Sequence, residues 1–167
     1  WYKGQDIPWY KGDTMIKTFR GSMASDTQQK IRLSTNTGDM GYRIVKFQVI
    51  GENPQTEGYE SVLKIFTTEP GAIDGNIDFS DPQLVAAAFL TGDHAPSQMF
   101  EQVIVVDNMK FNQDIYVTHN NTQGNGVNYY LELEQVKLDL NENTVATLKD
   151  IRLSLIHISE PTRRTPI

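Results

Sequence analysis

The sequence predicts an all-β protein, an antiparallel β-sandwich of eight or nine strands with a jelly-roll-like arrangement. Short segments alternate apolar and polar residues with a period of two, as half-buried strands do. The connections between them are rich in Gly, Pro, Asn and Asp, and no segment has the pattern of a long helix. With 167 residues, the chain is long enough for one domain with a hydrophobic core.

The best patterned segment is 113–138, which we expect to form a long β-hairpin. Ile115 and Val117 alternate with polar neighbours, and the loop 120–126 consists of residue types that tolerate turn conformations. The returning strand has two alternating sets, Tyr129, Leu131 and Leu133 against Tyr130, Glu132 and Glu134. The alternation changes phase at Gln135, which predicts a β-bulge near Glu134 and Gln135.

The other expected strands follow from the same pattern. They are an edge strand at 15–20, a half-buried strand at 30–35, strong strands at 41–50 and 59–68, a central strand at 101–107 and a last strand at 144–152. A turn is expected at Ser25 and Asp26, and a long loop at 69–82. The segment 83–91 suits a short helix started by Asp81 and Pro82 as well as it suits a buried strand, and both interpretations stay open.

Composition argues against several classes of function. The chain has 15 Lys+Arg against 21 Asp+Glu, whereas a nucleic-acid surface needs clustered basic residues. The lack of Cys excludes disulfides, Cys-ligated zinc and thiol catalysis. No apolar run approaches the ~20 residues of a membrane helix, and the first residues lack the apolar segment of a secretory signal. We expect a soluble single-domain protein without a cofactor and without a nucleic-acid or membrane partner.

The two ends differ in character from the rest of the chain. Residues 1–14 contain WYKG twice and show no strand or helix period, and 11–15 can be encoded by a ribosome-binding site followed by a start codon. We therefore expect 1–14 to be a read-through leader and Met15 to be the native start, the alternative being a genuine arm with two aromatic anchors. Residues 153–163 resemble a translated sequencing adapter. We expect 153–167 to be an artefact tail and 15–152 to be one β-sandwich domain.

Two sets of residues are candidates for catalysis. His94 and His119 are the histidines outside the tail, but strand alternation turns His119 and Thr118 to opposite faces, and no GxSxG motif accompanies them. The simpler interpretation of His119 is a polar residue where a strand enters a loop. Glu132 and Glu134 share one strand face about 7 Å apart, a spacing known from glycosidase carboxylates, yet they alternate with apolar residues as solvent-facing residues do. We expect neither set to be catalytic and the chain not to be an enzyme.

The segment 74–81 is a candidate for binding Ca²⁺, because its acidic and amide oxygens alternate along the chain. An EF-hand would need Gly at its sixth position and Glu at its twelfth, where Phe79 and Val85 stand, so an EF-hand is excluded. A solvated turn with side-chain caps is favoured over a looser Ca²⁺ site at Asp74, Asp78 and Asp81.

Five tyrosines are candidates for a platform on which a sugar ring stacks. They are Tyr42, Tyr59, Tyr116, Tyr129 and Tyr130. Because aromatic residues are also common in strands, most of them are more simply strand-face residues.

Seven segments carry a resemblance to a known class of protein. They read MIKTFRG (15–21), KIRLST (30–35), GYRIVKFQVI (41–50), IDFSDPQLVAAAF (77–89), DNMKFNQDIYVTH (107–119), NYYLELEQVKLDLNE (128–142) and TVATLKDIR (144–152). Together they resemble small structural proteins of marine tailed bacteriophages, which are abundant in viral metagenomes. The resemblance spans nearly all of 15–152 and supports Met15 as the start, but it carries over no site residues.

The resemblance implies a non-enzymatic virion protein, a component of the capsid, neck or tail. Such a protein is made in the bacterial host cytoplasm and assembles as a homo-oligomer and with other virion proteins. The alternative function is a carbohydrate-binding module on a phage fibre that recognises host glycans. That alternative predicts a coplanar set of exposed aromatic rings, or a Ca²⁺ near Asp74, Asp78 and Asp81. An enzyme such as a depolymerase would require two carboxylates, or a histidine and a carboxylate, in one cleft.

Overall fold

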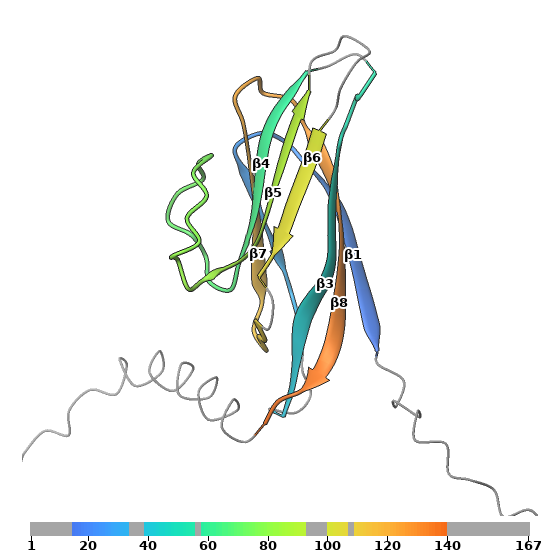
Figure 1. Cartoon of the computed structure of the whole chain (residues 1–167), viewed down its shortest axis with the longest axis vertical. Coiled ribbons are helices and arrows are strands. Elements are labelled where there is room, and N and C mark those ends of the chain that lie inside the picture. Colours follow the sequence, from blue (N-terminus) through green and yellow to red (C-terminus); the bar gives the residue numbers. More distant parts are fainter. Residues whose placement is uncertain (1–14, 34–38, 56–57, 93–99, 107–108, 140–167) are drawn as a thin grey trace, which may run out of the picture.

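The computed structural model describes residues 15–33, 39–55, 58–92, 100–106 and 109–139. Their strands are β1 (Ile16–Met23), β2 (Thr27–Ile31), β3 (Met40–Gly51), β4 (Tyr59–Phe66), β5 (Leu84–Gly92), β6 (Phe100–Val105), β7 (Ile115–Asn121) and β8 (Val127–Lys137). They form a three-stranded sheet in the order β1-β8-β3 and a five-stranded sheet in the order β2-β7-β4-β5-β6, packed face to face (Figure 1). The predicted antiparallel β-sandwich is confirmed, and the jelly-roll arrangement stays a prediction. Residues 1–14, His94, the predicted strand 144–152 and the tail 153–167 lie outside the described residues.

Strands β7 and β8 do not form a hairpin, so that prediction is wrong. Strand β7 pairs with β2 and β4 in the larger sheet, whereas β8 pairs with β1 and β3 in the smaller one. The segment 122–126 therefore carries the chain from one sheet to the other, and Gly124 adopts a positive φ of 79° there. Alternation identified the buried face of β7 and of most of β8 correctly, but it contains no information about which strand lies beside each of them.

The structure places a β-bulge in β3. Its register against β8 shifts between Ile44 and Lys46, which makes Val45 the extra residue. Before the bulge Ile44 points into the core, and after it Phe47 does, while Val45 stays 43% exposed. The bulge lets β3 keep its apolar side chains inward although their spacing changes phase.

The bulge predicted near Glu134 and Gln135 is wrong, because β8 pairs without interruption there. Arg43 lies opposite Glu134, and Tyr42 lies opposite Gln135. When the apolar patterns of two paired strands differ in phase, a bulge in either strand brings their inward side chains back into alignment. The sequence of one strand therefore does not tell which partner carries the extra residue.

The order of the larger sheet corrects one further prediction and decides an open one. Residues 101–107 were expected to be a central strand, but among the described strands β6 lies at the edge and pairs with β5 alone. Its run of β-branched residues reflects the preference of such residues for strands in general. The segment 83–91 is strand β5 and not a helix, and neighbours on both sides satisfy its backbone groups. The edge position of β1 is confirmed.

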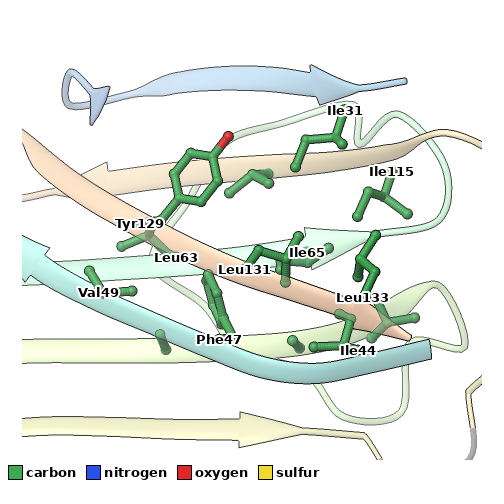
Figure 2. Packing of buried hydrophobic residues seen from close by; sticks show 14 of the residues in the cluster. Ile31, Ile44, Phe47, Val49, Leu63, Ile65, Ile115, Tyr129, Leu131 and Leu133 are labelled. Atoms are coloured by element: carbon green, nitrogen blue, oxygen red, sulfur yellow. The ribbon is translucent and has the colours of Figure 1, made fainter. Parts of the chain in front are cut away.

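The hydrophobic core lies between the two sheets. Figure 2 shows side chains of the larger sheet meeting those of the smaller one: Ile31, Leu63, Ile65 and Ile115 face Ile44, Phe47, Val49, Leu131 and Leu133. All of these are at most 8% exposed. Burying each such side chain stabilises the fold by about 1.5–3 kcal/mol, so this layer fixes how the sheets face each other.

Candidate functional site

His119 lies in the interior of the sandwich, not at the mouth of a loop. It is 0% exposed, and its Nδ1 is 3.0 Å from the backbone oxygen of Ala24. Since a carbonyl only accepts, Nδ1 carries the hydrogen, and Nε2 accepts from the Ser61 hydroxyl at 3.2 Å. Asn121 Nδ2 donates to the same hydroxyl at 2.6 Å. Burial lowers the pKa of His119 from its ordinary value of 6.5, so the neutral imidazole is the stable form at neutral pH.

Ser61 and His119 have the hydrogen bond of a nucleophile and its base, but both side chains are 0% exposed. No substrate reaches them in this arrangement. The cluster of Ser61, His119 and Asn121 ties β4 and β7 to each other and to the backbone after β1. Sequence reasoning missed it because Ser61 lies 58 residues from His119.

Glu132 and Glu134 lie on the outer face of the smaller sheet, and each has a cationic partner on β3. Lys46 Nζ is 3.9 Å from Glu132 Oε1, and Arg43 Nε pairs with Glu134. Tyr130 donates its hydroxyl hydrogen to Glu132 Oε1 at 2.8 Å. The two carboxylates are thus engaged in cross-strand pairs of a solvent-facing sheet, as the alternation indicates.

The three candidate Ca²⁺ ligands of the loop 67–83, Asp74, Asp78 and Asp81, line one pocket, but each carboxylate binds a different partner. Asp74 Oδ1 accepts from Lys64 Nζ at 2.7 Å, and Asp81 Oδ1 accepts from the Gln83 amide at 2.9 Å. Asp78 Oδ1 accepts from the amide and the hydroxyl of Ser80, and these bonds lower the pKa of Asp78. Among the described residues, no group of three His, Asp or Glu could hold a metal ion. The capped turns favoured by the sequence are what the loop contains.

Lys64 is a buried cation that sequence reasoning did not single out. It lies on the outer face of the central strand β4, its side chain is 6% exposed, and its Nζ contacts Asp74 Oδ1 and, at 2.8 Å, the Asn76 backbone oxygen. The loop 67–83 closes over it around a pocket of about 280 Å³. The Lys64 hydrogen bond, with a second from the Asn76 amide, lowers the pKa of Asp74. The sequence did contain a signal for this buried cation, because Lys64 stands between Leu63 and Ile65 in a strand that is apolar on both faces.

The tyrosines do not form a common platform. Tyr42 and Tyr59 are 0% exposed and Tyr129 is 6% exposed, so all three belong to the core. Tyr116 and Tyr130 are partly exposed, but they lie on the outer faces of different sheets. The coplanar set that the glycan-binding alternative predicts is therefore not assembled from these five residues.

A hollow of about 1010 Å³ lies at the smaller sheet. It is lined by three consecutive residues of each strand of that sheet and by three others: Arg20, Gly21, Ser22, Asn128, Tyr129, Tyr130, Gln48, Val49, Ile50, Pro54, Leu90 and Glu101. Cross-strand pairing places Arg20, Tyr130 and Gln48 in one row of outward side chains. In the described part of the chain no element covers this outer face (Figure 1). We name this hollow the outer-face hollow after the outward side chains that line it; its lining is mostly apolar and also includes the buried Val49, Tyr129 and Leu90.

Comparison with models of protein families and with curated proteins finds no match to the chain. Over the described ranges, no helix has the length and apolar character to span a membrane. Two surfaces of the described residues are candidates for a function, the edge of β6 and the outer-face hollow.

Proposed function

We propose that the chain is a non-enzymatic structural protein of a tailed-bacteriophage virion, which assembles with copies of itself and with other virion proteins. The resemblance of seven segments across 15–152 supports the virion assignment. The observation that carries self-assembly is the free edge of β6. A rigid sandwich with an unprotected strand edge is suited to building a larger particle from repeated contacts.

Strand β6 has the features of a pairing edge. Among the described strands it has a neighbour on one side only, and its outward side chains Phe100 and Ile104 are 57% and 43% exposed. Natural edge strands are usually protected by Lys, Pro or a bulge, and β6 contains none of these. Its single charged residue, Glu101, is engaged by the Val49 amide. The free backbone groups can therefore accept the edge strand of a neighbouring copy.

Light scattering on the purified full chain tests self-assembly. We expect a defined oligomer, since a head-to-tail edge contact closes into a ring such as a trimer, pentamer or hexamer. Ile104→Lys places a charge on the β6 edge and should dissociate the oligomer. Phe79→Lys is the matched control, because Phe79 is 55% exposed on the loop 67–83 and should leave the oligomer intact. A monomer at about 100 μM, or equal effects of both variants, overturns assembly through β6.

Mass spectrometry of purified marine virus particles tests the virion assignment separately. The tryptic peptide 47–64 starts after Lys46 and ends at Lys64, and it contains no internal Lys or Arg. We expect this peptide in the particle fraction at an abundance comparable to that of other structural proteins. Its presence in the soluble cellular fraction alone contradicts a virion role.

Glycan binding is the second candidate function, and one observation favours it. The outer-face hollow combines a partly exposed tyrosine with amide and guanidinium side chains, which are the groups that proteins use to bind sugars. Tyr129 and Tyr130 both line the hollow, but Tyr129 is 6% exposed, so Tyr130 is the one partly exposed ring there and the coplanar set of aromatics expected for this alternative is not present among the lining residues.

A further inference from the structure

We propose that the outer-face hollow binds an acidic saccharide, with Arg20 on its carboxylate and Tyr130 in contact with a sugar ring. The Tyr130 ring also has Lys46 Nζ 5.6 Å from its centroid. This inference goes beyond assembly and gives the glycan-binding alternative a location and a ligand class. Its key side chains, Arg20 and Tyr130, differ from the β6 side chains Phe100 and Ile104 that carry self-assembly. The two proposals can therefore fail independently.

Three strands place the polar side chains of the hollow side by side. Tyr130 lies in the middle strand β8, directly opposite Arg20 of β1 and Gln48 of β3. Asn128, two residues before Tyr130, projects from the same face. With about 1010 Å³, the hollow reaches the upper end of the ~300–1,000 Å³ range of small-molecule sites. It is large enough for more than one group of a ligand to bind at once.

The charges on this face leave one cation uncompensated. The chain carries a formal net charge of −6, yet the face holds three cations against Glu132 and Glu134. Arg43 and Lys46 are the cations paired with those carboxylates. The exposed Arg20 has no ion pair among the described residues. A single free guanidinium in a hollow favours a ligand with an isolated negative charge.

The neighbours of Arg20 indicate what else the ligand contains. A tyrosine ring offers an apolar face to the C–H groups of a pyranose. The amides of Gln48 and Asn128 can donate to and accept from sugar hydroxyls. A guanidinium binds a carboxylate through two parallel hydrogen bonds. A sugar acid presents these groups together, whereas a nucleic acid would need several free cations and this face has one.

Calorimetric titration of the full chain with tetragalacturonate tests the proposal, and methyl-esterified tetragalacturonate is the matched ligand without charge. We expect the acid form to bind and the ester to bind at least about tenfold more weakly. Binding of the acid form should weaken as NaCl is raised, because the pair is exposed to solvent.

Two variants with matched controls assign the site. Arg20→Gln should weaken binding of tetragalacturonate by about tenfold, and Tyr130→Ile by about five- to tenfold. Arg32→Gln removes the same charge beside the other sheet, and Tyr116→Ile removes the tyrosine that, like Tyr130, has a Lys Nζ near its ring. Both controls should bind as the unmodified chain does. If Tyr130→Ile does not fold, the exposed Arg20 and Arg32 variants decide by themselves.

Three results would overturn the proposal. They are no binding of tetragalacturonate up to about 5 mM, equal binding of its ester, or equal weakening by Arg20→Gln and Arg32→Gln. Light scattering on the same samples reports the oligomeric state. A change of binding without a change of oligomer separates ligand recognition from assembly through β6.

Discussion

Glu101 Oε1 accepts a hydrogen bond from the backbone amide of Val49 at 2.7 Å, and this contact joins the edge strand of one sheet to the edge strand of the other. Val49 belongs to β3, which among the described strands pairs with β8 alone, so its amide points to the other side of the smaller sheet. Glu101 belongs to β6, at the edge of the larger sheet. The Glu101 side chain thus gives the Val49 amide a hydrogen-bond acceptor and links the two sheets along one side of the sandwich.

Removing this acceptor should destabilise the fold. We expect Glu101→Ala to lower the free energy of unfolding by about 1–2 kcal/mol, because the Val49 amide loses its partner. Glu101→Gln keeps an oxygen at this point and should cost less than half as much. Urea unfolding measures both, with Gln102→Ala, an exposed neighbour on β6, as the control. An Ala variant as stable as the unmodified chain would show that the contact contributes nothing.

The stability of the fold should fall as the pH drops below about 6.5, the ordinary pKa of histidine, because of His119. Its pKa is lowered in the folded state, chiefly by burial, with Asp26 acting weakly in the opposite direction. The unfolded chain therefore takes up a proton at this residue first. The contribution of the neutral imidazole is complete above the unfolded value of 6.5 and is lost as the pH falls from there toward the lowered folded pKa.

The variant His119→Gln isolates that effect, because its side chain stays neutral throughout. Urea unfolding at several pH values should show a smaller loss of stability for the variant than for the unmodified chain over the same range. The variant should also be less stable at pH 7.5, since the Ala24 carbonyl and the Ser61 hydroxyl lose a well-placed partner. Parallel pH profiles would assign the acid sensitivity to other groups.

Removing Asp74 should lower the free energy of unfolding more than removing Lys64, its partner in the ion pair. Asp74→Ala leaves the ammonium of Lys64, which is 6% exposed, with the Asn76 carbonyl, and we expect a loss of about 1–2 kcal/mol. The exposure of Asp74, at 58%, keeps this loss below that of a fully buried pair. Lys64→Met removes the charge together with its need for a partner and should cost less. Thermal or urea unfolding ranks the two, and the reverse order would contradict a buried, dependent cation.

Thr118 offers a stabilising substitution. Its Oγ1 is buried and has no hydrogen-bond partner among the described residues, and the side chain is 1% exposed. Thr118→Val keeps the shape and the strand preference but removes the unsatisfied hydroxyl, so the free energy of unfolding should rise by about 1 kcal/mol. The control is Thr27→Val, which removes a hydroxyl that donates to the Ala24 carbonyl at 2.7 Å. That control should be neutral or destabilising, and a loss of stability in Thr118→Val would mean that its hydroxyl has a partner.

The sequence by itself indicated most of the strand segments, 83–91 excepted, and which side of most strands is buried. Ile31 and Leu33 are buried on one face, and Leu131 and Leu133 alternate with the partly exposed Glu132 and Glu134, as their spacing indicates. The turn at Ser25 and Asp26 was also predictable, and Asp26 adopts the positive φ of 57° that such turn residues tolerate. These features depend on neighbours within a few residues, which a pattern records.

Only the tertiary structure decided which strands lie beside one another. It separated β7 from β8, moved the bulge to Val45 and placed β6 at an edge. It also buried His119 against Ser61, and it brought Arg20, Gln48 and Tyr130 into one row. Alternation describes the two faces of a single strand, whereas pairing depends on contacts between segments far apart in the chain. Both candidate surfaces of this protein arise from pairing, and the sequence pattern could not reveal them for that reason.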